Sequence, residues 1–172
     1  MKKYLALVMV VFGSLFSCAQ KGIGFSLGVA SSKAGMVNVE YFINKNGFSA
    51  GFSYQSNHAL GKKVNDITAG SYAIGNGVYF LSADLGYTRF LSEKFSVGGE
   101  ISLANKIFYQ NLSDNSFSSG AYHRNYKTEF ELAIGGMIAY DINDIIGVFA
   151  GYNTIREAAL GLRIKFVHGN PE

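Results

Sequence analysis

Residues 126–140 read YKTEFELAIGGMIAY, and along most of this stretch apolar side chains alternate with polar or small ones. Successive side chains of a β-strand point to opposite faces, so a period of two predicts a strand with one apolar face. The apolar face would carry Tyr126, Thr128, Phe130, Leu132, Ile134, Ile138 and Tyr140. The opposite face would carry Lys127, Glu129, Glu131, Ala133, Gly135 and Ala139. This stretch is the clearest of a series of predicted strands.

The same period of two recurs along the rest of the chain and predicts strands of similar character. These further segments are residues 22–30, 36–43, 48–55, 79–88, 95–106, 146–152 and 158–166. With residues 126–140 they make eight predicted strands, and we predict no helix. The chain is therefore expected to be all-β.

The connections between the predicted strands differ in length on the two sides of the sheet. Residues 44–47, 91–94 and 141–144 form tight turns, whereas residues 56–76 and 110–125 form long polar loops. Up-and-down barrels of the outer membrane have short turns on the periplasmic side and longer loops outside. The even number of strands and this asymmetry predict an eight-stranded antiparallel up-and-down transmembrane β-barrel.

The N-terminus has the pattern of a secretory signal peptide. The basic residues of MKKY are followed by an apolar run at residues 5–16 and by small residues before Gln20. A spanning helix needs about 20 apolar residues, more than this run provides. We therefore predict a signal peptide over residues 1–19, cleaved after Ala19, and one barrel domain over residues 20–172.

A second interpretation of the leader concerns Cys18. The sequence Leu15-Phe16-Ser17-Cys18 also fits a lipoprotein cleavage box, in which Cys18 would be lipidated as the first mature residue. Both interpretations send the chain out of the cytoplasm.

The tyrosines indicate that the apolar face points toward lipid. Eight of them are predicted on apolar faces near strand ends, in two aromatic girdles around a band of aliphatic side chains. Such girdles are typical of a lipid interface, whereas a soluble core does not sort tyrosine by height. At the periplasmic ends the girdle residues are Tyr41, Tyr87 and Tyr140. At the opposite ends they are Tyr54, Tyr79, Tyr109, Tyr126 and Tyr152.

The charged residues of the strands are predicted on the opposite face, inside the barrel, because charge is costly against lipid. They are Glu40, Asp84, Glu100, Lys106, Lys127, Glu129, Glu131, Arg163 and Lys165. Eight strands enclose a space that side chains just fill. We expect the acids to pair with Arg163, Lys165 and their neighbours, which would give a plugged interior, and we expect Glu131 and Arg163 to have buried partners. A narrow ion path is the alternative.

Composition excludes several other classes of protein. The 172 residues carry a formal charge of +3, which falls to +1 without Lys2 and Lys3 of the leader. This balance is far from the broad basic surface that nucleic-acid binding needs. The single cysteine cannot form an internal disulfide or a structural zinc site, and no pair of histidines has metal-ligand spacing. We predict no metal and no cofactor.

In these features the chain resembles the small eight-stranded outer-membrane barrels of the OmpA transmembrane-domain and OmpX type, over residues 22–166. The resemblance implies a location in the outer membrane, contact with its lipid and lipopolysaccharide, and insertion by the barrel assembly machinery. We expect a monomer whose long loops at 56–76 and 110–125 make any surface contacts, with an unknown partner. The chain departs from the family in continuing for six residues beyond Phe166.

The family also includes lipid-modifying enzymes, so the loop histidines need an interpretation. His58 and His123 could approach each other above the outer rim, where lipid A acylases and deacylases hold catalytic His and Ser. The chain has no recognisable match to their local motifs, and we predict no catalytic residues. The alternatives are an outer-leaflet lipid enzyme, a narrow channel and a soluble periplasmic lipid carrier.

Overall fold

The computed structural model describes residues 21–56, 58–67, 70–114 and 120–168. The predicted signal peptide, with Cys18, lies outside these residues, as do residues 169–172 and parts of both long connections. Within the described ranges, no helix is long and apolar enough to cross a membrane.

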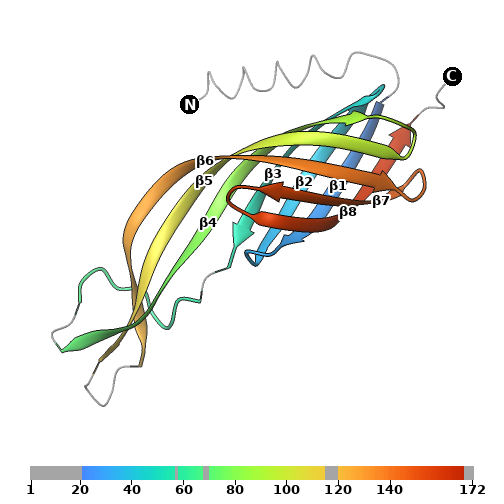
Figure 1. Cartoon of the computed structure of the whole chain (residues 1–172). Helices are drawn as coiled ribbons and strands as arrows, with labels where there is room; N and C mark the ends of the chain where they lie inside the picture. Colours follow the sequence, from blue (N-terminus) through green and yellow to red (C-terminus); the bar gives the residue numbers. More distant parts are fainter. Residues whose placement is uncertain (1–20, 57, 68–69, 115–119, 169–172) are drawn as a thin grey trace.

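Eight antiparallel strands form one closed sheet in chain order (Figure 1). They are β1 (Lys21–Ala30), β2 (Ala34–Ile43), β3 (Asn46–Gln55), β4 (Ser71–Phe90), β5 (Phe95–Asp114), β6 (Tyr122–Asp141), β7 (Ile146–Asn153) and β8 (Glu157–His168). The first and last strands close the ring, in a register that runs from Lys21 opposite His168 to Ala30 opposite Ala159. The predicted all-β, eight-stranded up-and-down barrel is confirmed.

Glycines on the inward face give bulky side chains room inside this narrow barrel. A Cβ atom at Gly28 of β1 would lie 2.8 Å from Cζ of Phe149 and 2.9 Å from the carbonyl oxygen of Leu160. The Phe149 ring is itself buried. The alternation of large and small residues thus determines which face of each strand points out of the barrel and which points into it.

Three short turns lie at one end of the barrel, at residues 44–45, 91–94 and 142–145, and we call this the short-turn end. The opposite end has two short turns, at residues 31–33 and 154–156, and the two long connections. Asn44 has a φ of 53°, a left-handed conformation that Asn tolerates better than most residues. The first residue of β1 pairs with the last residue of β8 at the same end, as an even number of strands requires.

Strands β4, β5 and β6 are much longer than predicted and leave the barrel together. The ladder between β3 and β4 ends at Leu81, and β7 pairs with β6 only from Gly135 onward. We call the remaining part, residues 71–80, 106–114 and 122–134, the extension. In it β5 pairs with both β4 and β6. Figure 1 shows the extension curving well beyond the other strands. The predicted loops 56–76 and 110–125 are therefore shorter than expected.

Candidate functional site

The turn between β7 and β8 folds into the barrel and delivers an arginine to its interior. Arg156, at the end of this turn, has only 3% of its surface exposed. Its Nη1 donates to Asp84 Oδ2 and to Ser53 Oγ, each at 2.7 Å. Its Nη2 forms an ion pair with Glu100. One turn is thereby tied to β3, β4 and β5.

Further polar groups satisfy the two carboxylates around Arg156. Asp84 accepts hydrogen bonds from Ser53 Oγ at 2.5 Å and from Ser82 Oγ at 2.9 Å. Glu100 accepts one from Asn153 Nδ2 at 2.6 Å. The cavity that remains beside these groups has a volume of about 10 Å³, room for one water molecule at most. The described interior is therefore filled at this level.

A second charged group lies on β2, β6 and β8. Arg163, which is completely buried, places Nε 2.8 Å from Glu40 Oε2 and lies over the Phe42 ring at 5.7 Å. The Nε–H is not aligned on that oxygen, so the contact is an ion pair rather than a good hydrogen bond. Lys165 Nζ donates to Asp141 Oδ2 at 2.6 Å. Each buried charge in this group has an opposite charge beside it.

Four of the predicted interior charges lie elsewhere. Lys127 and Glu129 are on the extension, where they pair with each other and are 55% and 43% exposed. Lys106 and Glu131 pair at the base of the extension, where their side chains are 24% and 41% exposed, so the partner of Glu131 is only partly buried. The reason is that β6 continues past the end of β7 with its alternation unchanged, so the pattern alone does not mark where the barrel ends.

Sequence reasoning missed Asp141 because it was assigned to a tight turn, and Arg156 because it lies between the last two predicted strands. One signal was available. The predicted interior held five carboxylates against four cations, so one cation was missing. Arg156 supplies that charge for Asp84 and Glu100.

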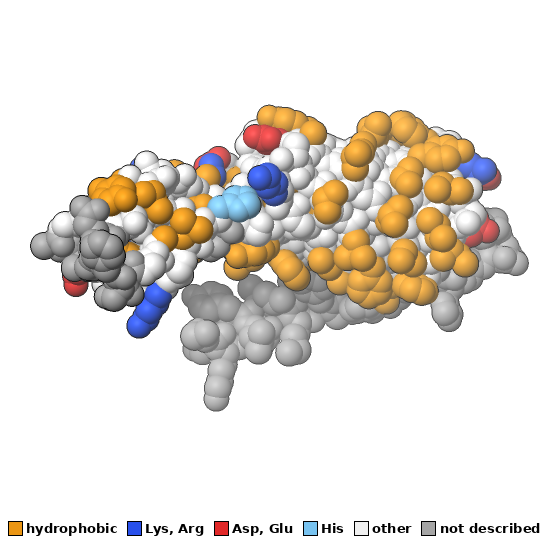
Figure 2. All heavy atoms as spheres, turned by 90° about the horizontal axis from the view of Figure 1, so that it is seen from below, with side chains coloured by type: hydrophobic (Ala, Val, Ile, Leu, Met, Phe, Trp, Pro, Cys, Tyr) orange, Lys and Arg blue, Asp and Glu red, His pale blue; other side chains and the backbone are white. Residues whose placement is uncertain are grey.

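The outer wall of the barrel is apolar and open. Figure 2 shows hydrophobic side chains spread over the barrel part of one face. Among the outward residues that are more than half exposed are Leu81, Leu85, Ile101, Leu103, Ile138 and Leu162. Contiguous apolar surface of this extent is unusual on a protein surrounded by water.

Most of the predicted girdle tyrosines lie on the surface, with one exception. The exposed ones are Tyr54, Tyr87, Tyr126, Tyr140 and Tyr152, and Tyr41 and Tyr79 are half-buried. Tyr109, in contrast, is only 4% exposed, so its predicted girdle position is wrong. Residues 58–67 fold over it, and the backbone N–H of His58 donates to its hydroxyl at 3.0 Å.

The two loop histidines both contact Tyr109 but are not arranged for catalysis. His58 Nε2 lies 3.4 Å from Lys33 Nζ, and His123 Nδ1 lies 3.0 Å from the carbonyl oxygen of Leu60. In the described residues neither ring bonds to a carboxylate or a hydroxyl nucleophile, and no cluster of metal-ligating side chains occurs. General-base activation of a nucleophile needs such a partner.

This geometry defines a class of protein: a small, filled, eight-stranded β-barrel with an apolar outer wall. No family model and no curated protein matches the chain. Similar solved structures include Ail of Yersinia pestis, at 14% identity and a TM-score of 0.49 over 86% of this chain and 97% of that one.

Two further similar structures are barrels as well. Neisserial surface protein A has 14% identity and a TM-score of 0.43 over 86% of this chain and 95% of that one. The N-terminal barrel domain of Pseudomonas aeruginosa OprF has 13% identity and a TM-score of 0.45 over 86% and 97%. The architecture of the small outer-membrane barrels is recognised in this chain by its own closed ladder of eight antiparallel strands.

Proposed function

We propose that this protein is a non-enzymatic integral barrel of the outer membrane, inserted by the barrel assembly machinery, with an extension that makes contacts outside the lipid. One observation carries the proposal. The closed barrel exposes its aliphatic side chains outward and buries charged ones such as Arg156 and Arg163 inside. A protein folded in water has the opposite arrangement.

The aromatic side chains support a lipid environment for this wall. At the short-turn end, Phe48 and Tyr87 lie 5.5 Å apart between ring centroids on the outer face, and Phe25 and Phe166 lie 6.2 Å apart. Exposed tyrosines such as Tyr152 occur toward the other end. Aromatic rings at both margins of an apolar band favour a membrane interface.

The filled interior argues against two alternatives. A channel needs a continuous polar path, whereas ion pairs of Arg156 and Arg163 occupy the described interior. A soluble lipid carrier needs an enclosed apolar cavity, and the space beside Arg156 is too small for an acyl chain. The larger apolar hollow of about 630 Å³, lined by Leu27, Phe52 and Leu162 among others, is open on the outer wall. The interior charges are therefore assigned a structural role.

The extension is the part suited to surface contacts. Tyr72 and Ile74 of β4 and Leu60 and Ile67 of the preceding connection are exposed apolar side chains beyond the barrel. Exposed apolar groups rimmed by polar ones favour a protein or lipopolysaccharide partner. Lipid A chemistry is disfavoured because, among the described residues, neither His58 nor His123 has an acidic or nucleophilic partner.

Cell fractionation tests the proposal. The full chain, produced in a Gram-negative host, is expected in the outer-membrane fraction and to need detergent for extraction. Its folded form should migrate differently from its boiled form on a gel. A protein that stays in solution without detergent would contradict the membrane assignment.

A further inference from the structure

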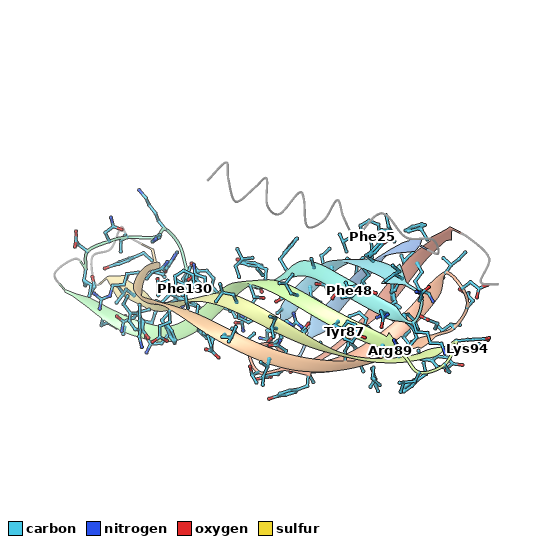
Figure 3. All side chains as sticks on the ribbon, turned by 90° about the horizontal axis from the view of Figure 1, so that it is seen from above. Phe25, Phe48, Tyr87, Arg89, Lys94 and Phe130 are labelled. Atoms are coloured by element: carbon cyan, nitrogen blue, oxygen red, sulfur yellow. The ribbon has the colours of Figure 1, made fainter. Side chains whose placement is uncertain are left out.

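Arg89 occupies an unusual place on the outer wall, directly after a row of apolar side chains on β4. Leu85, Tyr87 and Arg89 alternate with inward residues and so share the outward face. All three are exposed. Figure 3 shows Arg89 at the short-turn end, close to Tyr87 and Phe48 and near Lys94.

The guanidinium of Arg89 is positioned by a neighbouring strand. Asn46, its register partner on β3, accepts a hydrogen bond from Arg89 Nη1 at 2.7 Å and another from the Tyr87 hydroxyl at 2.8 Å. One amide oxygen therefore fixes the guanidinium beside the phenol group. A fixed guanidinium loses less entropy when it binds a ligand.

Arg89 has N–H donors for which the described residues provide no acceptor. Its guanidinium has five N–H groups, and the structure pairs one of its nitrogens with Asn46. No carboxylate among the described residues forms a salt bridge with it, unlike the buried arginines Arg156 and Arg163. The unpaired donors sit where an anion can approach from outside.

The surroundings fit an anion that is attached to acyl chains. On the barrel side of Arg89 the wall is apolar, with the Phe48 and Tyr87 rings first and Leu85 beyond them. On the other side, Lys45 and Lys94 are exposed in the turns 44–45 and 91–94, with Glu93 as the only acid in these two turns. A phosphate at Arg89 would have its acyl chains on the aromatic and aliphatic wall.

We propose that Arg89, held by Asn46 beside Tyr87, binds the phosphate of an anionic phospholipid in the periplasmic leaflet. The inference rests on the proposed function, because the short-turn end faces the periplasm only in a membrane barrel of that orientation. Arginine donors bind phosphate oxygens as a fork. The positive charges of Lys45 and Lys94 favour a headgroup with net negative charge over a zwitterionic one that carries its own ammonium.

Native mass spectrometry of the purified protein in non-ionic detergent tests the inference, with phosphatidylglycerol and phosphatidylethanolamine of identical acyl chains as probes. The parent should bind phosphatidylglycerol more tightly. Arg89→Gln should weaken that binding about five- to tenfold, the loss expected for one cation at a lipid surface plus its hydrogen bond. Asn46→Ala, which keeps the charge but frees the guanidinium, should weaken it less.

Lys62→Gln is the matched control, because it removes one positive charge from the connection at the opposite end and should leave binding unchanged. Inorganic phosphate should not displace the lipid. Equal binding by parent and Arg89→Gln, an equal loss in Lys62→Gln, or displacement by inorganic phosphate would each overturn the inference. Insertion into phosphatidylcholine vesicles, followed by the gel shift on boiling, reports separately on the proposed function. A barrel that inserts but has no headgroup preference overturns this inference alone.

Discussion

Arg156 Nη1 lies 2.7 Å from Asp84 Oδ2 inside the barrel, although the two residues are 72 positions apart in the chain. The contact joins the β7–β8 turn to β4 and, through Glu100, to β5. Both side chains are almost completely buried, so water cannot solvate either charge if its partner is removed. This relationship gives the first prediction.

Arg156→Met should destabilise the barrel by about 3–5 kcal/mol, because it leaves the carboxylates of Asp84 and Glu100 without their cation. Urea unfolding of the protein refolded in lipid vesicles measures the change. Lys127→Met is the matched control, since Lys127 is more than half exposed on the extension. Its loss should cost less than about 1 kcal/mol. Equal stabilities of the two variants would show that water reaches Arg156.

Residues 126–140 show how far the sequence alone predicts this fold. Their alternation correctly placed Leu132 and Ile134 on the exposed wall and Ala133 inside. Strand number, order and antiparallel pairing followed from the same pattern and from the short turns. Each of these features depends on residues that are neighbours in one strand or one turn. A pattern of period two can therefore predict them.

The features that the sequence did not predict depend on segments that meet in space. Gly75 and Gly77 look like loop residues, but pairing with β5 holds them in β4. Tyr109 has the pattern of an exposed strand residue, but a connection folds over it. Arg156 looks like a solvated turn residue because nothing in its neighbours shows that the turn bends inward. Periodicity predicts the strand face on which a side chain lies. It does not predict whether a distant segment of the chain packs over that side chain.

The second prediction compares two acids that the sequence placed together inside the barrel. Glu40→Gln removes the charge beside the fully buried Arg163 and should cost several kcal/mol, about 3–5 by analogy with other buried pairs. Glu131→Gln breaks a pair that is partly exposed and should cost about 1 kcal/mol or less. The free energy of unfolding in the same vesicles checks both. A larger loss for Glu131→Gln would contradict the assigned positions.

The third prediction concerns packing of the inward glycines. Gly28→Ala places a methyl group against the Phe149 ring and a backbone carbonyl of β8, and should cost about 1–3 kcal/mol. Gly35→Ala is the control, because its Cβ would meet no atom within 4 Å. The difference in urea midpoint between these variants measures the effect. Gly28→Ala as stable as Gly35→Ala would mean that the ring moves aside freely.

The fourth prediction concerns the connection that covers Tyr109. Asn111 accepts a hydrogen bond from the N–H of Leu60 at 2.9 Å and donates to the carbonyl oxygen of His58 at 3.2 Å. Asn111→Ala should loosen residues 58–67 and speed trypsin cleavage after Lys62 and Lys63, while the unfolding midpoint of the barrel stays the same. Asn65→Ala, at an exposed position of the same connection, should cleave at the parental rate. No acceleration in Asn111→Ala would show that other contacts hold the connection.

The last prediction separates a binding surface from an enzyme. The double variant His58→Ala, His123→Ala should leave the lipid A of producing cells unchanged, because within the described part of the chain neither ring has a carboxylate to orient it or a hydroxyl to activate. Mass spectrometry of extracted lipid A, compared between cells with the parent, the variant and an empty vector, measures this. A lipid A species present with the parent and lost in the variant would establish catalysis. The gel shift on boiling verifies that the variant barrel is folded, so that an unchanged profile reports on chemistry and not on a missing protein.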